Sequence, residues 1–424
     1  MGGDVSFMGS RMSEATATQR SRGMRDLLPD EMDRLRAVED AFAAACRAWG
    51  YREIRTPVIE PLHLFTSAGT LSPRTLDRVY SFLDWDGWSG ERVVLRPDST
   101  IPAARLYAER LDGGRVAKLF YSQNVFRFTD DDSSREEWQC GVELMGDTGA
   151  RGDLELVLLA IESLRPLGLP AVTVRLSHAG IVRAVLAAAG MTPDDQSAAY
   201  DRLLDGDMSV VDDVEARVPQ LNAPLRMLFE IEGAGSGYIA NLRGPLTDVI
   251  PALATAFDEL AFVVAALEAQ GVAPKINAVL ARSFEYYSGL VMRFDIDGER
   301  VVTGGRYDEL IGLVGGKPVP ASGFALYVSP IIEMLAGKPH APSARTVVVQ
   351  ADGDDAGLLA VAYAAAQRLR EARLHVETVE GMHIVPGYRL ICRAASPHFT
   401  LESPSGSERF ERIEDVIAKL AASR

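Results

Sequence analysis

Apolar residues spaced three and four positions apart form one stripe between Pro29 and Gly50. The members of this stripe are Leu35, Val38, Phe42, Cys46 and Trp49. Proline and acidic residues are typical of the first turn of a helix, and glycine commonly follows the last turn. The pattern therefore predicts an amphipathic helix over residues 29–49. A similar stripe predicts a second helix over residues 153–164.

Between these two helices the chain has short apolar clusters separated by turn-rich segments. Residues 51–59 are expected to be extended, and strands are expected at residues 79–83, 93–95, 118–128 and 138–145. Further strands are expected at residues 289–296 and 300–303. Because most successive strands are joined by loops and not by helices, the pattern favours an antiparallel sheet over a Rossmann alternation.

The rest of the chain suggests an insertion and a further domain. Residues of about 185–275 are alanine-rich and mainly helical in pattern, with prolines as helix breakers. Residues 343–424 alternate strand and helix patterns, which predicts a small α/β domain. We therefore expect a disordered start at residues 1–20, a main domain at 21–336 and the α/β domain at 343–424. The predicted fold class is α+β, with an antiparallel sheet flanked by helices.

Composition narrows the class of protein further. The 424 residues are 47% hydrophobic and 24% charged, which is typical of a globular protein with a real core. The net charge of −15, with ten basic and eleven acidic residues in 343–424, argues against nucleic acid as a partner. No apolar run is long enough to span a membrane, and the start lacks the apolar core of a signal peptide. Three widely spaced cysteines favour a reducing, cytoplasmic location.

Six stretches carry a resemblance to a known family. They are residues 22–29 (RGMRDLLP), 54–60 (IRTPVIE), 95–100 (LRPDST), 126–127 (FR) with 135–143 (REEWQCGVE), 282–289 (RSFEYYSG) with 304–308 (GGRYD), and 323–331 (GFALYVSPI). In this order they resemble the motifs of class II histidyl-tRNA synthetases. The resemblance implies the class II synthetase fold, with residues 54–60 at a dimer interface.

The resemblance also implies a histidine pocket. At the matching positions the family binds the amino-acid ammonium through Asp98, Thr100 and Gln139. Glu143 and Tyr287 would contact the imidazole, and Arg282 the carboxylate. Arg127 and Tyr286 complete the predicted set of histidine-binding residues. All carry suitable chemistry, although Asp98 is one methylene shorter than the family's glutamate.

The part of the family's site that handles ATP departs from the pattern. Pro330 replaces the arginine that grips the triphosphate, so a cation has been lost. Thr129 replaces a glutamate, and the loop beside it carries three aspartates, Asp130 to Asp132. Carboxylates at that place would repel a polyanion. Adenylation is therefore expected to be lost, and we expect no catalytic residue, no metal and no cofactor.

A kept histidine pocket beside a lost ATP site resembles the regulatory subunit of ATP phosphoribosyltransferase. That family implies a partner, the short-form catalytic subunit, which the regulatory subunit activates and through which histidine inhibits its own biosynthesis. It also implies a homodimer within a hetero-oligomer. Two alternatives stay open: an active histidine–tRNA ligase, and another non-catalytic histidine-binding paralogue.

Overall fold

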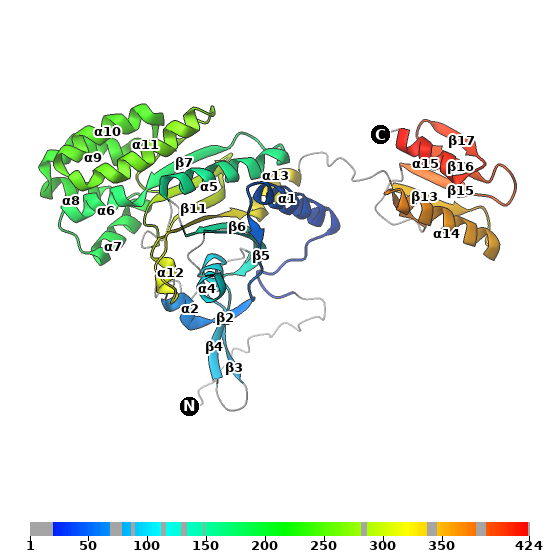
Figure 1. Cartoon of the computed structure of the whole chain (residues 1–424), viewed down its shortest axis with the longest axis horizontal. Helices are drawn as coiled ribbons and strands as arrows, with labels where there is room; N and C mark the ends of the chain where they lie inside the picture. The colour runs from blue at the N-terminus through cyan, green and yellow to red at the C-terminus, as the bar shows by residue number, and fades with distance from the viewer. Residues whose placement is uncertain are drawn as a thin grey trace, which may run out of the picture. The chain divides into compact units, whose positions relative to one another are not determined.

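The computed structural model describes residues 20–67, 79–85, 90–111, 116–128, 134–146, 149–280, 286–336, 346–378 and 387–422. The chain forms two compact units, Met1–Gly337 and Lys338–Arg424 (Figure 1). The expected disordered start lies outside the described residues except for Arg20. No helix in the described ranges is long and apolar enough to cross a membrane.

A nine-stranded sheet forms the centre of the first unit. Its strand order is β1-β5-β6-β12-β11-β10-β7-β9-β8. The bounds are β1 (Arg52–Glu53), β5 (Ala117–Phe126), β6 (Glu136–Met145), β7 (Thr173–His178), β8 (Gly233–Ala234), β9 (Lys275–Ile276), β10 (Leu290–Ile296), β11 (Glu299–Arg306) and β12 (Ala321–Tyr327). Neighbours are antiparallel except in the pairs β1–β5 and β7–β9. The expected antiparallel sheet is confirmed.

Three helices cover one face of this sheet: α1 (Pro29–Ala48), α5 (Gly149–Leu164) and α13 (Val328–Ala336) (Figure 1). The predicted helix over residues 29–49 ends one residue early, and the one expected over 153–164 begins four residues earlier. Alternate residues of β6 point into the core beneath these helices, namely Cys140, Val142 and Leu144. The remaining residues of the strand therefore face the opposite side.

The opposite face carries a smaller apolar cluster and the region of the predicted site. Here α2 (Leu62–Ser67), α4 (Thr100–Leu106), the π-helical turn η1 (Tyr107–Leu111) and α12 (Leu310–Leu313) pack against the sheet. A three-stranded antiparallel sheet, β2-β4-β3, adjoins it, with β2 (Ile59–Pro61), β3 (Ser81–Trp85) and β4 (Gly90–Leu95). The helix α4 was not expected from the sequence.

A helical insertion follows β7 and packs at one end of the sheet (Figure 1). Its helices are α6 (Ala179–Ala188), α7 (Pro193–Leu204), α8 (Ser209–Arg217), α9 (Asn222–Glu230), α10 (Gly235–Val249) and α11 (Ala254–Glu268), with short 3-10 turns η3 (Pro219–Leu221) and η4 (Pro251–Leu253). A further 3-10 turn, η2 (Arg165–Leu167), lies between α5 and β7. The short strands β8 and β9 join this segment to the main sheet, which the sequence pattern did not indicate.

The second unit is a mixed five-stranded sheet with two helices. Its strand order is β14-β13-β15-β16-β17. The elements are β13 (Thr346–Ala351), α14 (Ala356–Glu371), β14 (His375–Glu377), β15 (Tyr388–Cys392), β16 (Phe399–Ser403), β17 (Gly406–Phe410) and α15 (Ile413–Ala422). The expected α/β domain is confirmed, but the antiparallel hairpin β16–β17 was not expected.

Candidate functional site

A buried carboxylate, that of Glu143, lies at the centre of the predicted pocket. Glu143 is 1% exposed. Because side chains alternate along a strand, Glu143 and Gly141 lie on the face of β6 that points away from α1, α5 and α13. Its oxygens accept a hydrogen bond from Tyr121 Oη at 2.9 Å and another from Tyr307 Oη. Burial raises the pKa of Glu143 well above its ordinary value, while hydrogen bonds from Thr100 and Tyr121 lower it.

Glycines make room for the aromatic rings around this carboxylate. A Cβ on Gly141 would lie 2.3 Å from the Tyr121 ring, and one on Gly305 would lie 2.7 Å from the Tyr287 ring. A Cβ on Gly323 would lie 2.3 Å from Glu143 Oε2. These glycines occupy three neighbouring strands, β6, β11 and β12, so the floor of the site needs the space that they leave.

Asp98 and Thr100 lie where the chain enters α4. The Asp98 carboxylate accepts a hydrogen bond from the Ile101 backbone N–H at 2.9 Å, which satisfies one free amide of the first turn. Burial raises the pKa of Asp98, and the nearby charge of Arg127 lowers it. The Thr100 hydroxyl interacts with Glu143 and Tyr121, so α4 brings both predicted residues to the central carboxylate.

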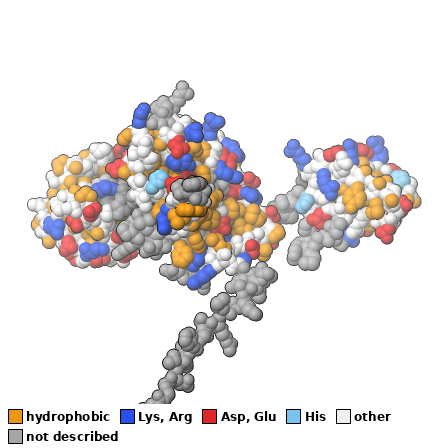
Figure 2. Space-filling view, turned by 90° about the horizontal axis from the view of Figure 1, so that it is seen from below, with side chains coloured by type: hydrophobic (Ala, Val, Ile, Leu, Met, Phe, Trp, Pro, Cys, Tyr) orange, Lys and Arg blue, Asp and Glu red, His pale blue; other side chains and the backbone are white. Residues whose placement is uncertain are grey.

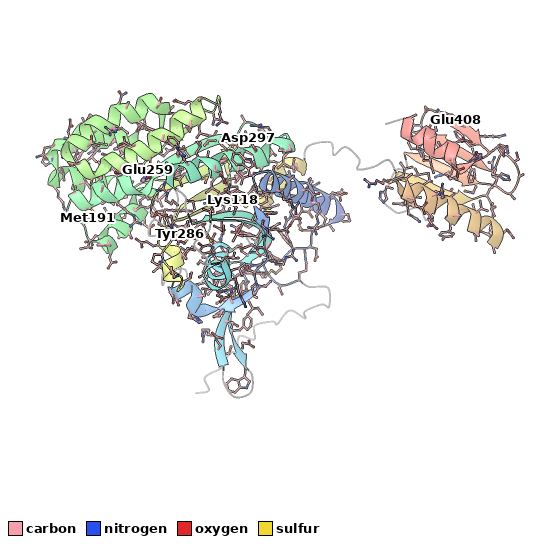
Figure 3. All side chains as sticks on the ribbon, viewed as in Figure 1. Lys118, Met191, Glu259, Tyr286, Asp297 and Glu408 are labelled. Atoms are coloured by element: carbon pink, nitrogen blue, oxygen red, sulfur yellow. The ribbon has the colours of Figure 1, made fainter. Side chains whose placement is uncertain are left out.

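Tyr286 and Tyr287 pack against the apolar cluster on this face of the sheet. Their rings meet edge to face with centroids 5.4 Å apart, and Tyr286 lies 5.0 Å from the Tyr307 ring. Figure 3 marks Tyr286 next to α12 and the main sheet. Burial raises the pKa of both phenols, and the charges of Asp98 and Glu143 raise it further. The Tyr286 hydroxyl is buried beside Thr100.

The remaining predicted residues lie around this centre. Gln139 lies four residues before Glu143 in β6, on the same face of the sheet, and is 4% exposed. Its Oε1 is buried without a hydrogen-bond partner in the described part of the chain. Arg127 lies at the rim, where its Nε donates to the Pro97 carbonyl at 3.0 Å and it pairs with Glu137. Arg282 lies outside the described residues.

The ATP side of the predicted site can be described only in part. Pro330 is the third residue of α13, so the start of that helix carries neither a cation nor a backbone donor at this position. Thr129 and the three aspartates that follow it lie outside the described residues. Within the described ranges, no group of three or more His, Cys, Asp or Glu residues could hold a metal ion.

A buried ionic network supports β11 and β12 from the other face of the sheet. Arg306 donates to Asp153 of α5 and to Glu259 of α11, the latter at 3.0 Å. Ser322 Oγ donates to Asp153 at 3.2 Å, and His178 Nε2 lies 3.1 Å from Glu259. The network therefore ties the helical insertion to the two strands that carry Gly305 and Gly323.

Sequence reasoning missed two residues of this cluster, Tyr121 and Tyr307. Tyr307 belongs to the quoted 304–308 motif, but nothing in the motif assigned it a partner. Tyr121 lies in a strand that was predicted correctly, and its alternation with Gln123 places both on the site face of β5. The alternation of residues along this strand was the one sequence feature that could have indicated Tyr121.

Comparison with known proteins identifies a matching family and relatives of two kinds. The family described as Histidyl-tRNA synthetase matches residues 23–331. An ATP phosphoribosyltransferase regulatory subunit of Dehalococcoides mccartyi is 43% identical over 360 residues, covering 84% of this chain and 87% of the relative. A histidine–tRNA ligase of Archaeoglobus fulgidus is 30% identical over 364 residues, covering 83% of each chain.

A solved structure that is named for both kinds of protein has a fold similar to that of this chain. The crystal structure of an ATP phosphoribosyltransferase regulatory subunit/histidyl-tRNA synthetase from Bacillus halodurans matches with a TM-score of 0.74 and 26% identity. The match covers 90% of this chain and all of that chain. The class II synthetase fold expected from the motifs is therefore confirmed. The chain belongs to the histidyl-tRNA synthetase family and, within it, to the ATP phosphoribosyltransferase regulatory subunits.

Proposed function

We propose that this chain is a non-catalytic subunit that activates the short-form catalytic subunit of ATP phosphoribosyltransferase and carries feedback inhibition by histidine. For such control, histidine must bind two states of the assembly with different affinity. A coupling free energy of about 1–3 kcal/mol between the histidine site and the catalytic subunit would be sufficient. We place this assembly in the cytoplasm, where the three free cysteines, Cys46, Cys140 and Cys392, would stay reduced.

The observation that carries the proposal is a set of buried acceptors on one face of the main sheet. Within the described ranges Gln139 Oε1 has no partner, and the Glu143 carboxylate interacts there only with two tyrosine hydroxyls and Thr100. A carboxylate has about four acceptor positions, so one is left for an imidazole N–H. A zwitterionic amino acid would supply the donors that these buried acceptors lack.

Asp98 is suited to the ammonium group of such a ligand. Asp98 lies close to Arg127, Glu143 and the two tyrosines, and burial, which raises its pKa, makes its ionised form costly. An ammonium placed beside Asp98 would favour the ionised carboxylate and recover part of that cost. In this proposal Arg282 meets the carboxylate of the ligand, as in the family.

The ATP side supports a non-catalytic role. Attack of a carboxylate on the α-phosphate of ATP needs cations around the triphosphate. Pro330 removes one of those cations at α13, and Arg127 already engages Glu137 and the Pro97 carbonyl. We infer that the chain does not form histidyl-adenylate and has no catalytic residue, metal or cofactor of its own.

The hairpin of β3 and β4 supports a homodimer. Phe82, Leu83 and Trp85 of β3 are 42%, 59% and 66% exposed, and Val58 and Ile59 of the 54–60 motif are also exposed. Figure 2 views this underside and shows hydrophobic side chains gathered on it. Exposed apolar side chains in one region are typical of protein–protein contacts. We propose that this surface pairs two copies, which then bind the catalytic subunits.

Two assays run together test the proposal on the isolated chain. Calorimetry is expected to show histidine binding that is lost in Glu143→Gln. ATP–pyrophosphate exchange with histidine is expected to be absent. Histidine-dependent exchange would instead indicate a histidine–tRNA ligase. Absence of both binding and exchange would contradict the histidine-sensing role. Histidine binding without exchange and without pairing to a short-form catalytic subunit would indicate another non-catalytic paralogue.

A further inference from the structure

A row of cationic side chains crosses the main sheet beyond the predicted histidine pocket. In the strand register Thr303 of β11 lies opposite Arg293 of β10, Arg293 opposite Arg175 of β7, and Arg175 opposite Lys275 of β9. Directly opposed residues of neighbouring strands point to the same face. Since Thr303 and Gly305 are two residues apart in β11, this is the face that carries Tyr287.

The carboxylates in this row do not balance its cations. Asp295, which is 3% exposed, accepts hydrogen bonds from both Arg175 and Arg293. Glu232 accepts from Arg175 and from Lys275. Among the described residues, three cations therefore share two carboxylates, in a chain with a net charge of −15. Like charges directly opposite on a sheet are destabilising, so an additional anion would stabilise this row.

The row borders a groove of about 390 Å³ between the sheet and α7, a volume typical of small-ligand sites. Arg175, Arg293, Asp295 and Asn277 are among its lining residues. In the described part of the chain, Arg293 makes a hydrogen bond only through Nε, which leaves its terminal amino groups free. Asn277 Oδ1 is buried and has no hydrogen-bond partner among the described residues.

We propose that this groove binds a small oxyanion that also carries a hydrogen-bond donor. The two terminal amino groups of Arg293 match a phosphate or carboxylate, which arginine binds in a bidentate manner. The donor of the ligand would satisfy Asn277 Oδ1, since an unpaired buried acceptor is costly. None of the predicted histidine-binding residues that the structure describes, a set without Arg282, is among the residues that line the groove. A ligand site here goes beyond the proposed function.

Calorimetry on the full chain at constant ionic strength tests the proposal with three probes. Inorganic phosphate supplies the oxyanion alone, glycerol 3-phosphate adds hydroxyl donors, and malate presents carboxylates with a hydroxyl. We expect saturable binding, with glycerol 3-phosphate tighter than inorganic phosphate. Comparison of malate with glycerol 3-phosphate shows whether carboxylate or phosphate is preferred. Arg293→Gln is expected to weaken binding at least tenfold, while Asp295 keeps Arg175 as its partner.

Asn277→Ala provides a second test, because it removes an Oδ1 atom that has no partner among the described residues. It is expected to abolish the advantage of glycerol 3-phosphate over inorganic phosphate. Arg243→Gln is the matched control, since Arg243 pairs with Asp258 on α10 and α11 and is not among the groove residues. The proposal is overturned if no probe binds saturably, or if binding persists in Arg293→Gln and is lost in Arg127→Gln.

Discussion

The Tyr307 hydroxyl donates a hydrogen bond to the buried Glu143 carboxylate, although 164 residues separate the two in the chain. Glu143 lies in β6 and Tyr307 directly follows β11, with β12 between these strands. Gly323 of β12 allows the contact, because a Cβ there would lie 2.4 Å from Tyr307 Oη. The contact therefore depends on three strands and on a missing side chain in the middle one.

The Glu143→Gln variant separates ligand binding from stability. Tyr121 and Tyr307 bond different oxygens of Glu143, so glutamine keeps an acceptor for one hydroxyl and places an NH₂ donor beside the other. The amide also cannot ionise, so we expect histidine binding to fall below detection in calorimetry. Burial holds the folded-state pKa of Glu143 well above its ordinary value of 4.5, and the charge of Asp98 adds to this. The folded chain therefore keeps a proton that the unfolded chain releases as pH rises above about 4.5.

The raised pKa of Glu143 predicts the direction in which stability changes with pH. Glu143 contributes most to stability below its unfolded pKa, and that contribution is lost as pH rises toward the raised folded pKa. The glutamine variant has no such group, so its free energy of unfolding is expected to fall less with rising pH than that of the wild type. Urea unfolding at several pH values from 4.5 upward measures the difference. Parallel stability curves for the two proteins would contradict the burial of an ionisable Glu143.

A methyl group at position 323 is expected to close the site. In Gly323→Ala the new Cβ would lie 2.3 Å from both Glu143 Oε2 and the Val142 carbonyl. We expect a loss of about 1–3 kcal/mol in the free energy of unfolding, typical of overpacking, and at least tenfold weaker histidine binding. Denaturant unfolding and calorimetry measure the two effects.

Gly237→Ala is the control for that substitution. Gly237 lies within α10, and a Cβ there would meet nothing within 4 Å. Alanine is favoured over glycine in a helix by about 0.5–1 kcal/mol, so this variant should be slightly more stable and bind histidine normally. Equal effects of the two substitutions would show that the space around Gly323 does not matter.

Arg306 is expected to contribute strongly to stability, although it does not face the pocket. Its side chain is 9% exposed and pairs with Asp153, which is 2% exposed. Arg306→Met leaves the buried Asp153 without its cation, and breaking a buried pair in this way costs about 3–5 kcal/mol. The exposed pair of Arg243 and Asp258 gives the comparison, since Arg243→Met should cost less than about 1 kcal/mol. Similar losses in urea unfolding would argue against a buried network.

The exposed apolar side chains of β3 are expected to hold two copies together. Leu83→Asp with Trp85→Ser places a charge and a small polar group on this surface, which should convert a dimer to a monomer in sedimentation velocity. Tyr363→Asp is the matched control, because Tyr363 is 55% exposed but lies on α14 of the second unit. A dimer that persists in the β3 variant would place the interface elsewhere.

The sequence predicted those elements whose signal is local. The stripe from Leu35 to Trp49 repeats over several turns, and α1 was therefore predicted to within one residue of its end. The strands β8 and β9 have two residues each, too few for any period to show. The hairpin from Phe399 to Phe410 was missed, although Pro404 and Ser405 form a turn within it.

In the candidate site, too, contacts between distant parts of the chain could not be predicted from the sequence. Glu143 and Tyr287 could be named because the family supplies roles for those positions. Tyr121 and Tyr307 could not be named as partners of Glu143, because their contacts depend on which strands become neighbours. The space above Gly141 and Gly323, which Tyr121 and Glu143 fill, also depends on strand pairing and not on local sequence.

The most direct test of the account is reconstitution with a short-form ATP phosphoribosyltransferase catalytic subunit. The two purified proteins are mixed, their co-elution is followed, and phosphoribosyl transfer to ATP is measured with and without histidine. We expect a complex with higher activity than the catalytic subunit alone, inhibited by histidine. In Glu143→Gln the activation should remain and the inhibition should be lost. Absence of a complex or of activation, or inhibition that is unchanged in Glu143→Gln, would contradict the account.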